Sequence, residues 1–432
     1  MGGSTPSAIS VAYIVPGSGD AFTCENCLRD AVVAEPLRIL GHTVTLVPLY
    51  MPQLSRAQTT PVFFGAVSLY LRHRSPVFAN PPAWMTRILD SEALLRMAAR
   101  RAGSTRSAGL EEMTLSLLEG ESGSEAPEVE RLAGWLRDSC RPDVVHLSNA
   151  LLLGLARRVR ERAGAPVVCS LQDEDTWIDA MREPYRARAW ELLRERARDA
   201  ALFLPVSDRY GGLMRERLGF RPNAMRVVSA AVDPSLYRRS SLPLHPPVIG
   251  YLSRMSESQG LGRLADAFIA LRRRGYPRLK LVAMGGATAD DRSFLRRLRA
   301  RLVESGAGED VTLIHGFGLE ERVRFLSSLT VLSVPFDRGE ALGTFLLEAM
   351  AAGVPVVQPD VGGYRELLLE TGGGVLYDPS APGGLEGALG GLLSDPEALR
   401  RHGARGHEAV GARYTPRVVG ETLAQAYREV MG

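Results

Sequence analysis

The most constraining feature of this sequence is the alternation of short runs rich in β-branched residues with longer amphipathic stretches. The short runs are typical of buried strands, and the longer stretches are typical of helices that cover a sheet. The pattern predicts an α/β fold built from parallel sheets. The expected strands are Ile9–Val15, Thr43–Pro48, Val144–Leu147, Pro166–Leu171, Leu202–Val206, Arg226–Ser229, Val248–Leu252, Leu279–Ala283, Val311–His315, Val331–Pro335, Val354–Gln358 and Gly374–Tyr377.

The chain of 432 residues is too long for one ordinary core, so two domains of roughly 200 residues each are expected. We place the first at residues 1–235, with an insertion at about 51–140 where the alternation breaks. The proline-rich stretch Asp233–Pro247 is interpreted as a linker, and residues 247–416 as the second domain. A last helix, 417–432, has the first domain among its packing options.

Charge and hydropathy exclude several classes of protein. The 52 basic and 49 acidic residues nearly balance, whereas a nucleic-acid-binding protein carries a marked basic excess. No basic run precedes an apolar segment at the start, and no apolar stretch of about 18 residues occurs. A cytoplasmic protein is therefore expected, and peripheral membrane association stays open.

The four cysteines do not predict a disulfide framework in so long a chain. Cys24 and Cys27 form a CxxC motif, but no second such pair supplies the four ligands that structural zinc needs. Cys140 and Cys169 fall before and within separate predicted strands. Ordinary thiols are the simplest interpretation, with zinc and redox roles as alternatives, and we expect neither a metal nor a cofactor.

The segment Val334–Val357 carries the strongest chemical signal. It predicts a strand, a loop with Gly339 and Gly343, a helix and a second strand, and the free N–H groups where the helix begins suit phosphate or sugar oxygens. Glu348 falls among apolar residues of that helix, where a carboxylate needs a partner. A ribose diol and an arginine are the two candidate partners. Glu340, in the loop, either contacts a hexose or is an exposed acid without a role.

The spacing Glu340–x7–Glu348 followed by AMAAGVPVV resembles the signature of family 4 retaining glycosyltransferases. That resemblance implies the GT-B fold, two Rossmann-like domains whose parallel sheets face each other across a cleft. Other segments of the chain also resemble motifs of this family and occur in the same order. The resemblance covers most of the chain except about residues 51–135. These segments are Leu40–Val44, Pro142–His146, Ser253–Leu261, Met284–Gly286 and Val311–Phe317.

The resemblance implies a nucleotide-sugar donor bound by the second domain and an acceptor bound by the first. Glu348 would hold the ribose, Glu340 would contact the transferred sugar, and Arg254 would neutralise the departing diphosphate. Glu340 and Arg254 are therefore the catalytic candidates. The other donor-binding candidates are Leu342, Gly343, Thr344, Phe345, Gln259, Gly285 and Phe317, with Gly17, Ser18 and Gly19 from the opposite domain.

The sequence departs from the family pattern at two positions. Gln259 stands where the family has a lysine, so either Arg263 or Arg338 replaces that charge or the leaving group is less stabilised. Gln172 stands where many relatives have a histidine that faces the acceptor. Glutamine is no general base near neutral pH. The resemblance implies that the departing diphosphate accepts the proton of the acceptor hydroxyl.

Gln172, Asp173 and Asp175 are the acceptor-binding candidates, with Glu174 in the same acidic run. A solvated cluster that caps a helix is the competing interpretation of these acids. Two other functions are alternatives to transfer: a non-catalytic GT-B nucleotide-binding subunit, and another GT-B enzyme such as a phosphorylase or epimerase. The only lysine, Lys280, lies in a predicted strand, which argues against a pyridoxal phosphate enzyme. The donor's base and sugar, the acceptor (small molecule, glycan or lipid) and the oligomeric state are not predicted.

Overall fold

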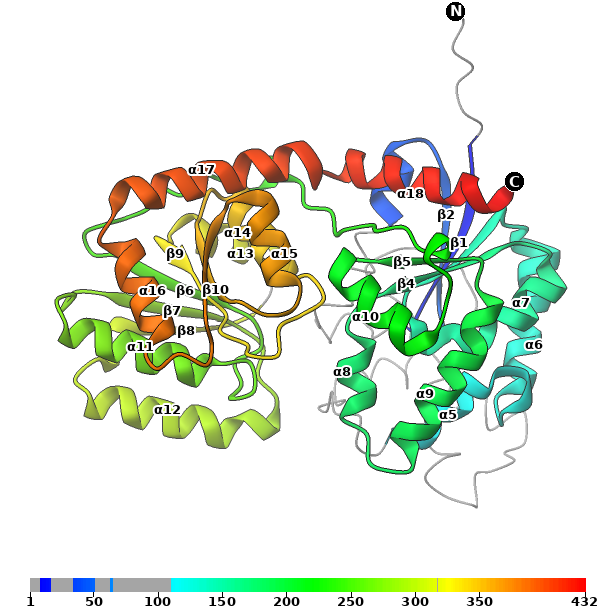
Figure 1. Cartoon of the computed structure of the whole chain (residues 1–432), viewed down its shortest axis with the longest axis horizontal. Helices are drawn as coiled ribbons and strands as arrows, with labels where there is room; N and C mark the ends of the chain where they lie inside the picture. Colours follow the sequence, from blue (N-terminus) through cyan, green and yellow to red (C-terminus); the bar gives the residue numbers. More distant parts are fainter. Residues whose placement is uncertain (1–7, 17–33, 51–62, 65–109, 317) are drawn as a thin grey trace, which may run out of the picture. The chain divides into compact units, whose positions relative to one another are not determined.

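The computed structural model describes residues 8–16, 34–50, 63–64, 110–316 and 318–432. The chain divides into two compact units, one formed by Met1–Ser229 with Val419–Gly432 and the other by Ala230–Val418. Each unit has one sheet, and all the described strands are parallel to their neighbours (Figure 1). The predicted α/β class is confirmed.

In the described part of the first unit, the sheet has five strands in the order β2-β1-β3-β4-β5. Strands β3 and β5 are buried along their whole length, as expected for a parallel sheet covered on both faces. The chain order reverses between β1 and β3. The strands are β1 (Ser10–Val15), β2 (Thr43–Pro48), β3 (Val144–Leu147), β4 (Val167–Leu171) and β5 (Leu202–Pro205).

The predicted strand Arg226–Ser229 is wrong. The segment runs along β5, where the N–H groups of Arg226 and Val228 donate to carbonyls of that strand, but only Met225 forms a bridge. Pro205 at the end of β5 has no N–H with which to continue the ladder. The segment therefore follows the sheet edge without becoming a strand.

The helices of the first unit begin and end at recognisable signals. Helix α10 begins after Ser207, whose side chain accepts the N–H of Tyr210, and it ends at Gly219, whose φ is +73°. Residues 34–39 are also helical. The α-helices are α5 (Glu111–Glu119), α6 (Ala126–Trp135), α7 (Ala156–Ala163), α8 (Glu174–Asp179), α9 (Tyr185–Arg196), α10 (Asp208–Leu218) and, from Val419 onward, α18 (Pro416–Met431).

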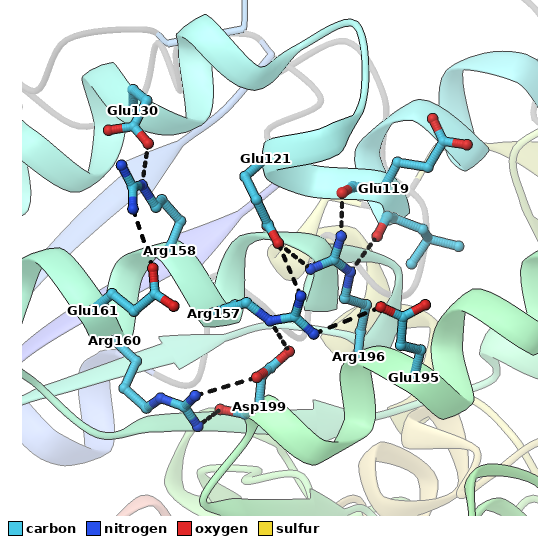
Figure 2. A network of polar contacts seen from close by, with 11 residues as sticks. Glu119, Glu121, Glu130, Arg157, Arg158, Arg160, Glu161, Glu195, Arg196 and Asp199 are labelled. Atoms are coloured by element: carbon cyan, nitrogen blue, oxygen red, sulfur yellow. Dashed lines mark hydrogen bonds and ion pairs between the residues drawn. The ribbon is translucent and has the colours of Figure 1, made fainter.

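A network of arginines and acids joins four of these helices, α5, α6, α7 and α9 (Figure 2). The buried guanidinium of Arg196 in α9 donates to the main-chain oxygens of Leu118 and Glu119, which end α5, and to the carboxylate of Glu121. Arg157 in α7 pairs with Glu121 as well. Arg196 thereby satisfies carbonyl groups that a helix terminus leaves without internal partners.

The end of the chain is attached to the first unit by a buried histidine. The ring nitrogens of His146 in β3 lie 2.7 Å from the Tyr427 hydroxyl of α18 and 2.8 Å from Ser170 Oγ of β4. Burial lowers the pKa of His146 to about 3, so the ring is neutral near pH 7. This uncharged link fixes α18 to the sheet.

Within the predicted insertion, the structure describes residues 63–64 and 110–140. Phe63 and Phe64 are buried, and the Phe63 ring contacts Trp135 of α6. These two aromatic residues of the insertion therefore pack in the core of the first unit.

In the second unit, the described strands have the order β11-β10-β9-β6-β7-β8. The chain moves from β6 to β8 in one direction, returns to β9 beside β6 and continues to β11 in the other. Helices α11 and α12 therefore lie on one face of the sheet, and α14 and α15 on the other (Figure 1). The strands are β6 (Val248–Leu252), β7 (Lys280–Gly285), β8 (Val311–His315), β9 (Val331–Leu332), β10 (Val356–Pro359) and β11 (Gly374–Tyr377).

The proline-rich stretch Asp233–Pro247, predicted as a linker, belongs to the second unit. Tyr237 is buried, and Ser240 forms hydrogen bonds with the main chain at Ala352 and Leu329. The stretch has few helix-forming residues, as a linker does, yet its side chains pack on the second unit.

The helices of the second unit are α11 (Leu261–Arg273), α12 (Arg292–Glu304), α13 (Leu319–Ser327), α14 (Thr344–Ala351), α15 (Gly362–Thr371), α16 (Gly384–Leu393) and α17 (Pro396–Arg413).

Candidate active site

The reversal of strand order in the second unit positions two loops that carry predicted site residues. The loop after β6 contains Arg254 and Gln259, and the loop after β9 contains Glu340. In open parallel sheets, loops that diverge at such a point form the usual ligand crevice. The predicted residues of the second domain thus gather at the carboxyl edge of one sheet.

Glycines bring these loops into direct backbone contact. A Cβ on Gly260, whose φ is +82°, would lie 2.1 Å from the Pro335 carbonyl oxygen, and one on Gly285 would lie 1.8 Å from the Ser253 oxygen. Neither position can accept a side chain without moving the main chain. The loops after β6, β7 and β9 are therefore fixed against one another.

The loop that precedes α14 depends on two further glycines. Gly339 and Gly343 have φ values of +72° and +84°, and a Cβ on Gly343 would lie 2.8 Å from the Tyr364 ring. The Glu340 carbonyl accepts the N–H of Gly363 at 2.8 Å, which fixes the loop to the start of α15. The N-cap residue of α14 is Gly343, which has no side chain to accept the first N–H groups of the helix, and such groups suit an anionic ligand.

Of the residues beside Gly343, Leu342 and Phe345 are buried in the core, so their main chain is the part that can face a donor. Thr344 opens α14. Phe317, another donor-binding candidate, lies outside the described residues. So do Gly17, Ser18 and Gly19, and the CxxC pair Cys24 and Cys27.

Glu348 has the arginine partner that the sequence left as an alternative. Its Oε1 atom accepts from Arg322 Nη2 at 2.9 Å and from the Tyr237 hydroxyl at 2.7 Å. Burial raises the pKa of Glu348, while Arg322 and Tyr237 oppose that rise. Neither partner could be predicted from the sequence, because their approach depends on how α13 and the 233–247 stretch pack on α14.

Arg254 is also engaged. Its Nε and Nη2 atoms donate to the two carboxylate oxygens of Asp291 at 2.9 and 3.1 Å, and Nη2 donates to Thr288 Oγ1 at 2.9 Å. Although burial acts to raise it, hydrogen bonds from Arg254 and Thr288 lower the pKa of Asp291. Thr288 and Asp291 form a capping box before α12, a local pattern that by itself does not indicate the contact with Arg254.

Three charged groups act on the buried hydroxyl of Tyr251, which donates to the Arg254 carbonyl at 2.7 Å. Burial raises the pKa of Tyr251, Glu340 and Asp291 raise it further, and Arg254 opposes them. The charges of the catalytic candidates Glu340 and Arg254 therefore act on the same hydroxyl in opposite directions.

The position of the missing lysine is occupied by a neutral amide. Gln259 is half-buried, and its Oε1 atom has no hydrogen-bond partner among the described residues. Of the two arginines considered as replacements, Arg263 pairs with Asp337 at 2.6 Å and with the Pro335 carbonyl, whereas the Arg338 residue is exposed. Arg263 thus lies beside the loop that carries Glu340.

In the first unit, the acceptor candidates follow β4, and the interpretation of their acidic run as a solvated cluster is wrong for Glu174. This residue is 2% exposed and accepts hydrogen bonds from the N–H groups of Ala150 and Gln172 and from the Tyr210 hydroxyl. Burial raises the pKa of Glu174 to about 7. A carboxylate that receives three donors organises the loop instead of facing water.

The other acceptor candidates surround this buried acid. Gln172 is also buried, and its Nε2 donates to the Ser148 carbonyl at 3.0 Å. Asp173 and Asp175 are half-buried, and Asp173 has a φ of +60°. Asp175 Oδ1 lies 2.9 Å from the Tyr210 hydroxyl. The two aspartates are therefore the more accessible pair.

Neither a metal cluster nor a membrane-spanning helix occurs in the described part of the chain. No group of three or more histidine, cysteine, aspartate or glutamate side chains gathers there in a way that could hold a metal ion. No described helix is both long and apolar enough to cross a membrane.

Comparisons with known proteins define the class. The model of "Glycosyl transferases group 1" matches residues 235–409, and that of "Glycosyltransferase Family 4" matches residues 117–236. Two solved structures share the fold at 16% identity. They are the Anabaena protein HepE in complex with UDP (TM-score 0.68, 98% of this chain and 100% of that one) and a sucrose-phosphate synthase from Thermosynechococcus elongatus (TM-score 0.69, 97% and 98%).

The chain therefore has the GT-B fold and belongs to the family 4 glycosyltransferases, a family of enzymes. A GDP-mannose-dependent α-mannosyltransferase of Mycolicibacterium smegmatis is 29% identical over 70% of this chain and 77% of its own length. A D-inositol 3-phosphate glycosyltransferase of Acidothermus cellulolyticus is 28% identical over 49% and 50%. The chain spans about half the length of several curated relatives that it matches, 50% and 46% in two cases.

Proposed function

We propose that this protein is a retaining glycosyltransferase that moves a sugar from a nucleoside diphosphate donor to an acceptor hydroxyl by displacement on one face of the sugar. The second unit would bind the donor, and the first unit would supply acceptor contacts. The observation that carries the proposal is that the loops with Arg254 and Glu340 meet beside the start of α14 at the reversal of strand order. Anionic ligands favour such a site.

Each group would perform a distinct task. Departure of the diphosphate leaves negative charge on its oxygens, which Arg254 and the first N–H groups of α14 stabilise. Glu340 accepts hydrogen bonds from hydroxyl groups of the transferred sugar, and Glu348 holds the ribose. Metal-independent transfer follows if these groups supply the charge that a divalent ion provides in other transferases.

On the acceptor side, the half-buried Asp173 and Asp175 would orient the hydroxyl that attacks. Gln172 is held by the Ser148 carbonyl and would shape the surface beside them. A neutral glutamine does not take a proton at neutral pH, so the hydroxyl proton would pass to an oxygen of the departing diphosphate. This transfer balances the charge without a protein base.

The names of similar proteins suggest two candidate nucleotides for the donor, GDP and UDP. The Mycolicibacterium relative is named as GDP-mannose-dependent, and the Anabaena structure holds UDP. A thermal-shift panel of UDP, GDP, ADP and dTDP tests the donor site without an acceptor, because a ligand that binds the native state raises the unfolding temperature. We expect one diphosphate to give a selective shift that Glu348→Ala abolishes. No shift with any nucleotide at millimolar concentration would contradict the proposal.

A nucleotide-binding protein without transferase activity is the second candidate, and two observations favour it. Arg254 is held by Asp291, and a neutral Gln259 occupies the place of a cation. Donor hydrolysis separates the two functions, since a competent transferase turns over its donor slowly with water as acceptor. Proton NMR of the released sugar would also give the anomeric configuration, and inversion would reject the retaining mechanism.

A further inference from the structure

The carboxylate of Glu348 is held from one side only. Both hydrogen bonds that described residues make to it, from Arg322 and from Tyr237, fall on Oε1. An ionised carboxylate oxygen offers about two acceptor positions, so these two donors saturate Oε1. Among the described residues, Oε2 is therefore the oxygen left for a ligand. The Glu348 side chain is 11% exposed, which is enough for contact with the edge of a ligand but not for full solvation.

The two partners also favour the ionised carboxylate. Burial raises the pKa of Glu348, and both Arg322 and Tyr237 act against that rise. A ribose presents two neighbouring hydroxyl groups that donate hydrogen bonds, and a charged acceptor binds such donors more strongly than a neutral one. The pair thus prepares Glu348 for a diol.

Tyr237 is itself held rigidly. The side chain of Asp233 accepts the N–H of Ser235 at 2.9 Å, and the Tyr237 N–H donates to the Pro234 carbonyl at 3.2 Å. One residue before this turn, the Val232 N–H donates to the main chain of Tyr414 at 2.8 Å. The turn that carries Tyr237 is therefore held by hydrogen bonds, and this fixes the position of the Tyr237 hydroxyl beside Glu348.

We propose that Tyr237 and Arg322 are positioning residues that aim Glu348 at both hydroxyl groups of the donor ribose, which makes the site selective for ribonucleoside over 2′-deoxyribonucleoside diphosphates. The inference rests on the proposed function, because it assumes that Glu348 meets the nucleotide. It narrows the donor to sugars linked to ribonucleoside diphosphates such as UDP, GDP or ADP, and excludes dTDP-linked sugars.

Titration calorimetry on the full chain tests this inference with UDP and GDP and with the 2′-deoxy and 2′,3′-dideoxy forms of each. We expect the wild type to bind the ribonucleotide at least tenfold more tightly than its dideoxy form, since a buried acceptor without its donor is costly. Tyr237→Phe should reduce that ratio about three- to tenfold by weakening the ribonucleotide alone. Arg322→Lys should act in the same direction.

A matched control is available in the same unit. The hydroxyl of the buried Tyr414 donates to the exposed Glu370 at 2.9 Å, so Tyr414→Phe removes a tyrosine–glutamate hydrogen bond outside the site. This variant should keep the wild-type ratio. If Arg322→Lys does not fold, Arg322→Met with Glu348→Gln removes both charges together and should show no preference for ribose.

The outcomes separate the inference from the proposed function. If Glu348→Gln abolishes the ribose preference but Tyr237→Phe leaves it intact, or weakens both ligands equally, the positioning role is wrong and the ribose site stands. If Glu348→Gln itself leaves the ratio unchanged, or if no nucleotide binds, the assignment of Glu348 to the donor fails and the inference fails with it.

Discussion

The Tyr210 hydroxyl lies 2.8 Å from Oε2 of Glu174, the most buried acid of the loop that follows β4. The same hydroxyl lies 2.9 Å from Asp175 Oδ1. A phenol has one proton and can donate to only one of the two oxygens. A proton on Glu174 would complete the chain, because Glu174 would donate to Tyr210 and Tyr210 to Asp175.

The first prediction concerns the pH dependence of stability. Burial raises the pKa of Glu174 from 4.5 to about 7, so the native state holds this proton more tightly than the unfolded chain. This contribution to the free energy of unfolding is fully present below pH 4.5 and is lost as the pH rises through 7. At 1.36 kcal/mol per pKa unit, the contribution is about 3 kcal/mol. Glu174→Gln removes the titration, so the unfolding free energy of the variant relative to wild type should rise with pH.

Urea unfolding at pH 5, 6, 7 and 8 measures this difference. Tryptophan fluorescence reports on the first unit, because all four tryptophans fall within its residues. A difference between variant and wild type that does not change with pH would show that Glu174 does not titrate in this range.

The second prediction concerns the network in Figure 2. The Arg196 side chain is 3% exposed and donates hydrogen bonds to the last carbonyl groups of α5 and to the Glu121 carboxylate. Arg196→Met leaves these acceptors buried without a donor, which should lower the unfolding free energy by about 3 kcal/mol. Arg158→Met removes an arginine from the more exposed pairs with Glu130 and Glu161 and should cost less than about 1 kcal/mol. Similar losses in the two variants would contradict the capping role.

The third prediction tests the Arg254 pair. Arg254→Ala should lower kcat/KM for the donor at least tenfold, because the leaving diphosphate loses a bidentate donor. Asp291→Asn keeps the side-chain shape but removes the charge that orients the guanidinium, so we expect a smaller loss of about three- to tenfold. Steady-state kinetics with the donor found by thermal shift give both values. Full activity in Arg254→Ala would remove this residue from the catalytic machinery.

The sequence predicted the fold because the strands of a parallel sheet are buried on both faces and are readable one by one. It failed at Arg226–Ser229, where the outcome depends on Pro205 in a neighbouring strand, and at Asp233–Pro247, where composition suggested a linker but Tyr237 packs inward. Both errors come from contacts between distant segments, which local composition does not encode.

The candidate site was predictable to a similar depth. The glycine loop and the positions of Glu340 and Glu348 follow from local spacing, and the need for a partner follows from an acid in an apolar helix. The identity of the partner of Glu348 does not follow from the local sequence, because Arg322 and Tyr237 approach it from separate segments of the chain. For the same reason, the burial of Glu174 was missed.

The last prediction concerns the glycine that begins α14. Gly343→Ala places a Cβ at a φ of +84° and 2.8 Å from the Tyr364 ring, so the loop must shift where it meets the donor. We expect the donor KM to rise about tenfold and the unfolding free energy to fall by about 1–3 kcal/mol. Gly383 begins α16 with a φ of +71°, but a Cβ at this position would meet no atom within 4 Å among the described residues. Gly383→Ala should therefore lose stability from backbone strain while keeping the donor KM, and an equal rise in KM for both variants would show that strain, not the position of the loop, controls donor binding.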